Sequence, residues 1–84
     1  MSYDLVYTKK AKKQLKKLNK NESKRILIAL ERCRIRPISY VKKLVASPYY
    51  RLRVGEYRVV LDIKNNEMII LVLEVGHRKN IYKY

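Results

Sequence analysis

The first quarter of the chain alternates weakly and then takes up helical spacing. Residues 3–7 alternate as a short strand does. The next segment, 8-TKKAKKQLKKLNK-20, has lysines on one face and a recurring apolar set on the other, namely Ala11, Leu15 and Leu18. This periodicity predicts an amphipathic helix. Thr8 can cap its start, because a threonine oxygen can accept a hydrogen bond from a free amide of the first turn.

A second helix is expected over about residues 22–34, after a break at residues 19–21. Its main apolar face consists of Ile26, Leu30 and Cys33. Leu27 and Ile28 widen the apolar surface beyond one stripe, so this helix either packs on two sides or offers part of its surface to a partner helix. The helical structure is expected to end at Arg36-Pro37, because the residue before a proline is pushed out of the α region.

From Tyr49 onward the hydrophobic period changes to two, which predicts strands over residues 49–54, 57–64 and 67–75. The connector 38–47 has room for a short strand or turn around Val41 to Val45. Gly55-Glu56 has the glycine-first order of a type II′ turn, and Asn65-Asn66 suits a type I′ turn. The predicted fold is α+β in the order β-α-α-β-β-β, with a small, mostly antiparallel sheet and two N-terminal helices packed on one face. With 84 residues, the chain is expected to form one domain, residues 1–84.

A two-residue turn at Gly55-Glu56 fixes the register of the first hairpin. The opposed pairs are Val54 with Tyr57, Arg53 with Arg58, Leu52 with Val59, and Arg51 with Val60. Cross-strand partners share a face, and like charges placed directly opposite destabilise a sheet.

This register places Arg51, Arg53 and Arg58 on the face opposite the apolar one. Ile69, Leu71 and Leu73 share that face, and Asp62 is the one acid expected there. These arginines either lie over an exposed sheet with hydrated head groups or form a site for an external anion such as phosphate. The second interpretation is favoured.

The charge of the chain supports an anionic partner. Lysine and arginine number 21 against 7 acidic residues, a formal net charge of +14. Such a charge favours nucleic acid, an anionic membrane surface or an acidic protein as partner. The acidic residues are scattered, so no metal or other cofactor is expected. Cys33 is the one cysteine, no apolar signal-peptide core is present, and the longest apolar run, residues 68–73, is too short to span a bilayer. A soluble cytoplasmic protein is expected.

The C-terminal stretch 74-EVGHRKNIYKY-84 adds further candidate site residues. It holds the single histidine, His77, followed by Arg78, Tyr82 and Tyr84, and it can reach the arginine-bearing end of the sheet. Cleavage of RNA by its own 2′-OH needs a proton acceptor, positive charge for the phosphorane and a proton donor for the leaving oxygen. Arginines can supply the charge, histidine exchanges protons near neutral pH, and a tyrosine can stack on a base or help move a proton.

The segments 50-YRLRVGEYRV-59 and 75-VGHRKNIY-82, which follow two basic helices, resemble the RelE/ParE toxin superfamily of toxin–antitoxin systems. The resemblance implies a RelE-like sheet whose face opposite the helices cleaves mRNA in the ribosomal A site without a metal. By position, it assigns catalytic roles to Arg51, Arg53, Arg58 and Arg78, and to Tyr82 or alternatively Tyr84. RelE has lysines where this chain has Arg51 and Arg53, and arginine accepts protons poorly because its pKa exceeds 12. The general base is then expected to be His77 or a tyrosine.

The resemblance also implies a partner protein, an acidic RelB-like antitoxin that wraps the toxin. Such a partner suits the net charge of +14. Two other functions stay open at this point. The first is that of a ParE-like toxin, which shares the scaffold and inhibits DNA gyrase. The second is that of a basic RNA-binding module without catalytic activity.

Overall fold

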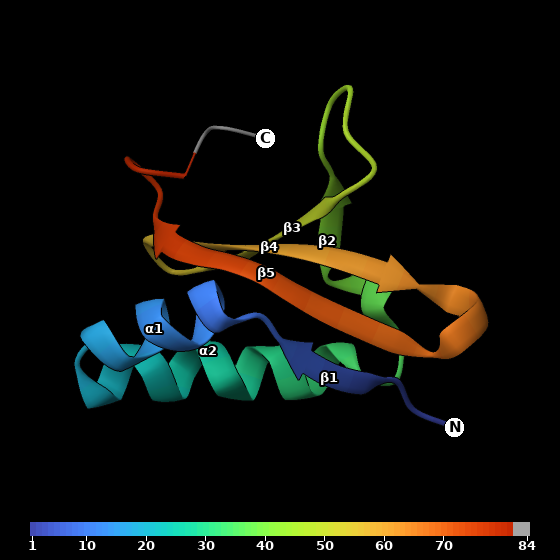
Figure 1. The fold of residues 1–84 in the computed structure, drawn as a ribbon, viewed down its shortest axis with the longest axis horizontal. Helices are drawn as coiled ribbons and strands as arrows, with labels where there is room; N and C mark the ends of the chain where they lie inside the picture. The colour runs from blue at the N-terminus through green and yellow to red at the C-terminus, as the bar shows by residue number, and fades with distance from the viewer. Residues whose placement is uncertain (82–84) are drawn as a thin grey trace.

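The computed structural model describes residues 1–81, in which two helices pack against one face of a five-stranded sheet (Figure 1). The helices are α1 (Lys9–Lys17) and α2 (Lys20–Cys33). The strands are β1 (Asp4–Tyr7), β2 (Val41–Lys43), β3 (Tyr50–Val54), β4 (Tyr57–Lys64) and β5 (Ile69–His77). Short 3-10 turns occupy Pro37–Ser39 and Asn65–Glu67. The predicted α+β fold is confirmed, and β2 is the short strand for which the connector had room.

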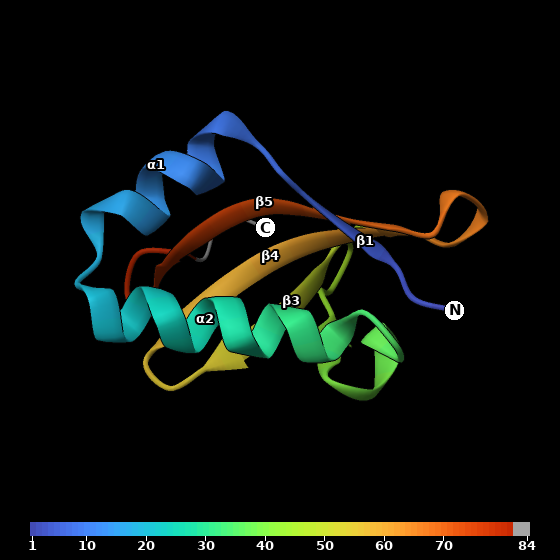
Figure 2. The same cartoon turned by 90° about the horizontal axis from the view of Figure 1, so that it is seen from below.

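The sheet has the strand order β1-β5-β4-β3-β2. Strand β1 runs parallel to β5, and the other three pairs are antiparallel. Seen from below, α2 runs across β4 and β3, and α1 lies beside β5 (Figure 2). Neither helix of residues 1–81 has the length and apolar character needed to cross a membrane.

Side-chain caps define where both helices begin. Thr8 precedes α1, and its hydroxyl accepts a hydrogen bond from the Ala11 amide at 3.1 Å, as predicted. Asn19 precedes α2, and its side-chain oxygen accepts a bond from the Glu22 amide at 2.9 Å. Each cap satisfies an amide that has no partner within its helix. The break between the helices is therefore shorter than the predicted residues 19–21, and α2 begins at Lys20.

The core lies between α2, the start of α1 and the sheet. The helices contribute Ala11 and the predicted stripe of α2, Ile26, Leu30 and Cys33, all fully buried. The sheet contributes alternating apolar residues of its helix-facing side, namely Leu52, Val59, Leu61, Ile70, Val72 and Val75. Burial of these side chains removes apolar surface from water, and this is the main force that holds the helices on the sheet.

The connection between β4 and β5 differs from the predicted two-residue turn. Lys64 pairs with Ile69, so four residues form the loop, and Met68 closes it in a left-handed conformation with φ 55°. Further along, Val60 pairs with Glu74 but Leu61 pairs with Val72, which leaves Leu73 as the extra residue of a β-bulge. A bulge changes which side chains face which side of a sheet. Every residue of β5 from Glu74 onward therefore has the opposite facing from the one that regular alternation predicts.

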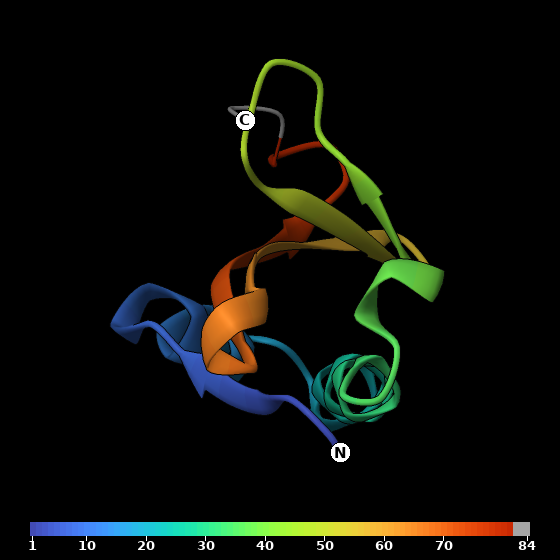
Figure 3. The same ribbon diagram turned by 90° about the vertical axis from the view of Figure 1, so that its right-hand side faces the viewer.

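The face opposite the helices carries two projecting segments. The loop between β2 and β3 and the chain after β5 both rise from it, in two perpendicular views (Figures 1 and 3). Ile81, in the second of these segments, is buried, and its side chain would meet a Cβ added at Gly76 at 3.5 Å. The chain after β5 thus turns back over the sheet on the side away from the helices.

Candidate active site

The β3–β4 hairpin places three arginines on the face opposite the helices. Gly55 opens its turn with φ 57°, which glycine adopts without steric cost. The register is the predicted one, with Arg53 opposite Arg58 and Arg51 opposite Val60. Because Leu52 between them is buried in the core, Arg51, Arg53 and Arg58 lie on the other side of the sheet. We call this side the arginine face.

Arg58 is held by the hairpin itself. Its Nη1 donates hydrogen bonds to the carbonyl oxygens of Gly55 and Tyr57, both at 2.9 Å. These two carbonyl dipoles stabilise the guanidinium and offset the repulsion from Arg53 across the strand pair. Within residues 1–81, the side chains of Arg51 and Arg53 have no hydrogen bond or ion pair, so their donors are available to an external anion.

Arg78, which directly follows β5, contacts the same turn. Its backbone amide donates to the Glu56 carbonyl at 2.8 Å, and its Nε lies 3.5 Å from Oε2 of Glu56. Both side chains are exposed, so this ion pair contributes little stability. The Gly55-Glu56 turn thus contacts both Arg58 and Arg78.

His77 lies on the side of the sheet that the helices cover. It pairs with Tyr57 across the β4–β5 ladder, and the two rings meet edge to face with centroids 5.7 Å apart. Its Nδ1 accepts a hydrogen bond from the Lys79 amide at 3.2 Å. The structure therefore does not bring His77 onto the arginine face. The cause is the bulge at Leu73, which reverses the facing of the last residues of β5.

The same bulge puts a carboxylate on the arginine face that sequence reasoning missed. Glu74 pairs with Val60, which in turn pairs with Arg51, so the three share one side of the sheet. Glu74 is 7 % exposed, and its Oε1 lies 2.7 Å from Lys10 Nζ, whereas its Oε2 is buried without a hydrogen-bond partner in residues 1–81. The expectation that Asp62 is the one acid on this face is wrong. Only a signal for the bulge could have revealed Glu74, and β-bulges have no distinct sequence pattern here.

Tyr82 and Tyr84 lie outside the described residues. Among residues 1–81, no three His, Cys, Asp or Glu side chains lie close enough together to hold a metal ion. Cys33 is buried, and burial raises the pKa of its thiol to about 11. A thiol with such a pKa is not a nucleophile at neutral pH. The arginine face thus offers guanidinium groups that can bind an anion.

Comparisons with known proteins identify the family. The model of the family described as ParE toxin of type II toxin-antitoxin system, parDE, matches residues 5–82. Toxin RelE3 of Methanocaldococcus jannaschii is 31% identical over 86 residues, which cover 95% of this chain and 96% of that protein.

Solved structures agree. A chain of the archaeal RelE-RelB complex from Pyrococcus horikoshii OT3 superposes with a TM-score of 0.81 at 26% identity, covering 95% of this chain and 99% of its own. A chain of the RelB-RelE antitoxin-toxin complex from Methanococcus jannaschii gives a TM-score of 0.74 at 30% identity, with 94% and 96% covered. The chain therefore belongs to the RelE/ParE toxin superfamily and is a RelE-like toxin of a type II toxin–antitoxin system.

Proposed function

We propose that this toxin is an endoribonuclease that cleaves mRNA in the ribosomal A site and so inhibits translation. The observation that carries the proposal is the gathering of Arg53, Arg58 and Arg78 around one hairpin turn, with Arg51 farther along the same strand. Guanidinium groups present planar paired donors that match phosphate oxygens. Messenger RNA supplies such phosphates at every nucleotide, and the similarity to RelE toxins favours mRNA over other polyanions.

The reaction we propose uses the RNA's own nucleophile. The 2′-oxygen attacks the neighbouring phosphorus, the bond from phosphorus to the 5′-oxygen breaks, and the proton lost by the 2′-OH is balanced by one gained at the leaving oxygen. Arg51, Arg53 and Arg58 stabilise the charge that develops on the phosphorane, a role for which preorganised donors in a site are well suited. Arg58 is the best preorganised of these, because the carbonyls of Gly55 and Tyr57 already fix its guanidinium.

Arg78 is proposed to bind phosphate beside Arg58, with Glu56 holding it near the turn in the absence of RNA. The proton acceptor is a different group, since arginine remains charged at all relevant pH values. We assign the proton transfers to His77, Tyr82 and Tyr84, the groups of the C-terminal stretch that can accept or donate a proton. An RNA strand that crosses the end of the sheet can meet His77 at this end, next to the Gly55-Glu56 turn.

The proposed partner is an acidic, RelB-like antitoxin. Both structures compared above are complexes of a RelE chain with RelB. A partner that carries many carboxylates would neutralise part of the +14 charge of this chain. Because it binds only the folded toxin, it is expected to raise the thermal midpoint of the toxin.

Cleavage is tested by inducible expression followed by primer extension on a translated message. We expect new 5′ ends within the coding region, and purified cleavage products that carry a 2′,3′-cyclic phosphate and a 5′-hydroxyl. The Arg58→Ala/Arg78→Ala variant should give no such ends. The matched control, Lys12→Ala/Lys13→Ala, removes the same charge from the exposed side of α1 and should cleave as the unmodified protein does. Growth arrest without new ends would exclude cleavage as the mode of action.

A second candidate function is inhibition of DNA gyrase. The observation that favours it is the match of the ParE toxin family model to residues 5–82. A supercoiling assay with purified toxin and gyrase separates the two. Loss of supercoiling together with an intact message would replace the ribonuclease proposal. Binding of RNA without either effect would indicate a basic RNA-binding module.

A further inference from the structure

Helix α2 carries a second stripe of residues beside its buried one, and most of this stripe is exposed. Its buried stripe is Ile26, Leu30 and Cys33. On the neighbouring face, Arg25, Ile28, Ala29 and Arg32 follow the spacing i, i+3, i+4, i+7, which aligns side chains along one side of a helix. Ile28 is 47% exposed, and both arginines are exposed. The stripe is therefore an apolar centre between two cations, open to solvent.

A groove separates this stripe from the end of β3. Its volume is about 330 Å³, with Arg25, Ile28, Ala29 and Arg32 on the helix side and Arg53 and Gly55 on the sheet side. The sheet edge is open here, because the pairing of β2 with β3 stops at Leu52. The guanidinium of Arg25 lies close to Gly55, so the helix and the hairpin turn meet at one end of the groove.

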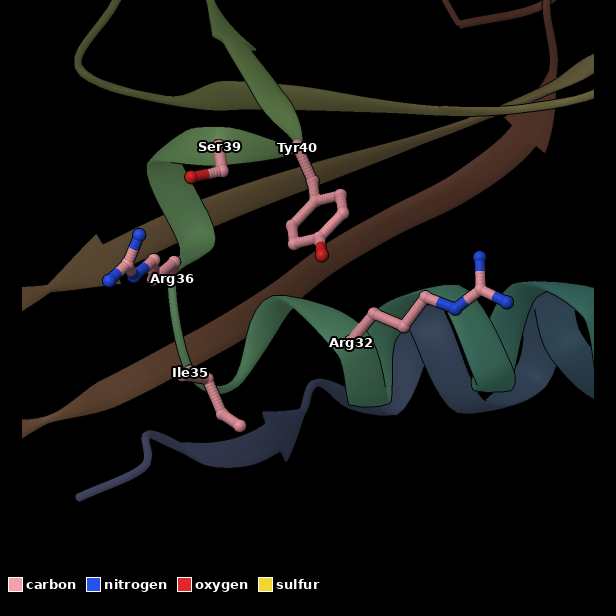
Figure 4. Close-up of a pocket in the computed structure, with 5 residues that line it drawn as sticks. All are labelled: Arg32, Ile35, Arg36, Ser39 and Tyr40. Atoms are coloured by element: carbon pink, nitrogen blue, oxygen red, sulfur yellow. The ribbon is translucent and has the colours of Figure 1, made fainter.

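A second hollow of about 430 Å³ also has Arg32 in its lining. Arg32, Ile35, Arg36, Ser39 and Tyr40 line it. In Figure 4 the ring of Tyr40 reaches from the start of β2 toward α2, and the Arg32 side chain extends along the helix away from Ile35. Ile35 and Tyr40 are 70% and 51% exposed. The two hollows lie along α2 and share Arg32, and we call them together the α2 groove.

The α2 groove is strongly cationic. Four arginines line it, Arg25, Arg32, Arg36 and Arg53, and no acidic residue does. Within residues 1–81, none of these four side chains has an ion pair or a hydrogen bond. Unlike a phosphate-binding surface, the groove alternates these charges with exposed apolar side chains, such as Ile28 and Ile35. Its occupant must therefore offer both carboxylates and an apolar stripe.

We infer that the α2 groove docks an acidic amphipathic helix of a partner protein. The residues at Arg25 and Arg32 are seven apart, about 10 Å along the helix axis. Two carboxylates with the same spacing on the partner can pair with them, while apolar side chains between the carboxylates pack on Ile28. The small side chain of Ala29 allows close approach of a second helix. The identification of this partner as the antitoxin rests on the function proposed above. The chemistry of the groove is independent of that function.

Docking in this groove has a consequence for the arginine face. Arg53 lines the groove and also stands opposite Arg58 in the hairpin. A partner helix seated in the groove therefore lies beside the arginine face, and a carboxylate that reaches Arg53 from there would compete with phosphate for its guanidinium.

The test uses the full chain and a synthetic helical peptide. In this peptide, glutamates seven positions apart flank two leucines, and a scrambled peptide of equal composition serves as control. Binding is measured by fluorescence anisotropy, and the contact surface by amide chemical shifts of isotope-labelled toxin. We expect shifts centred on Ile28 and Ala29 and binding that weakens with added salt.

Two charge-reversal variants locate the site. Arg25→Glu/Arg32→Glu should weaken peptide binding by about tenfold or more, because both ion pairs become repulsive. The matched control, Lys16→Glu/Lys24→Glu, makes the same charge change in the separate groove between α1 and α2, which Leu15, Leu18 and Leu27 also line. It should weaken binding by less than about threefold. All four positions are exposed, and the thermal midpoint of each variant checks its folding.

The opposite ranking of the two variants would place docking in the groove between the helices and overturn the inference. Equal binding of the scrambled peptide, or shifts at the α2 groove with an RNA oligonucleotide and none with the peptide, would overturn it as well. RNA cleavage is measured separately, and Arg25→Glu/Arg32→Glu is expected to retain it. A toxin that docks the peptide but cleaves no RNA would contradict the proposed function alone, and one that cleaves RNA but docks no peptide would contradict this inference alone.

Discussion

Arg53 and Arg58 face each other directly across the β3–β4 hairpin, but only Arg58 has its guanidinium bound by the protein. The two residues are therefore expected to differ in what they do for stability, although both are proposed to bind phosphate. Arg58 fastens the turn through two carbonyls. Arg53 is exposed and repels Arg58 across the strand pair. Within residues 1–81, its own guanidinium has no hydrogen bond or ion pair that would offset this repulsion.

Replacing each arginine with alanine separates these roles. Arg58→Ala should lower the free energy of unfolding by about 1–2 kcal/mol, because the hydrogen bonds to Gly55 and Tyr57 are lost. Arg53→Ala should leave it unchanged or raise it by a few tenths of a kcal/mol, roughly, because a like-charge pair disappears. Urea denaturation measures both. Both variants should lose RNA cleavage, and equal destabilisation by the two changes would contradict the structural distinction.

The Lys10–Glu74 pair gives a second prediction. Glu74 is nearly buried, and the Lys10 Nζ lies 2.7 Å from its Oε1. Lys10→Met should destabilise the protein by about 1–2 kcal/mol, because it leaves a buried carboxylate without its cation, and the exposure of Lys10 moderates the cost. Glu74→Gln should lower the free energy of unfolding by a smaller amount. In the double variant the loss should be close to that of Glu74→Gln alone, and additive losses would show that the two side chains act independently.

The two glycines of the chain should respond differently to alanine. Gly55 has φ 57°, and a Cβ there would stand 3.0 Å from an Arg25 nitrogen. Gly55→Ala should therefore destabilise the protein by about 1 kcal/mol or more. Gly76 has no such conformation, and its added Cβ would make an ordinary 3.5 Å contact with Ile81. Gly76→Ala is thus the matched control, with a smaller change in thermal midpoint.

Cys33 makes stability depend on pH in the alkaline range. Burial raises the pKa of its thiol to about 11 in the folded protein, whereas an exposed thiol titrates near 8.5. Between these values the unfolded chain has lost the proton that the folded chain keeps. The contribution of Cys33 is therefore complete below about pH 8 and is lost as the pH rises toward 11, at roughly 1.4 kcal/mol per pH unit. The difference in unfolding free energy between the unmodified protein and Cys33→Ala should shrink over this range. A constant difference would contradict the buried thiol.

The sequence was sufficient for the features that local chemistry specifies. The Thr8 cap, the buried stripe of α2 and the register set by Gly55-Glu56 all follow from residues near one another in the chain. The four-residue loop before β5 was not predictable in this way, because Asn65-Asn66 is also compatible with a tight turn. In the site, the hairpin register correctly predicted the face of Arg51, Arg53 and Arg58. Regular alternation along β5 predicted the wrong face for Glu74 and His77. Their facing depends on the bulge, and the bulge depends on how α1 meets β5. At this contact the side-chain oxygen of Gln14 accepts a hydrogen bond from the Val75 amide at 2.7 Å, and the Thr8 hydroxyl donates one to the Leu73 carbonyl.

The single extra residue at Leu73 reverses which side chains of β5 face each side of the sheet in the second half of the strand. Deleting it would reverse the facing of β5 from Glu74 onward, so that the Glu74 carboxylate would face the core and the His77 imidazole would face the arginine side. An insertion in a loop would only lengthen that loop, but this one decides which side of the sheet the residues from Glu74 onward face. Position-by-position comparison with a relative whose last strand is regular would consequently equate residues that point in opposite directions.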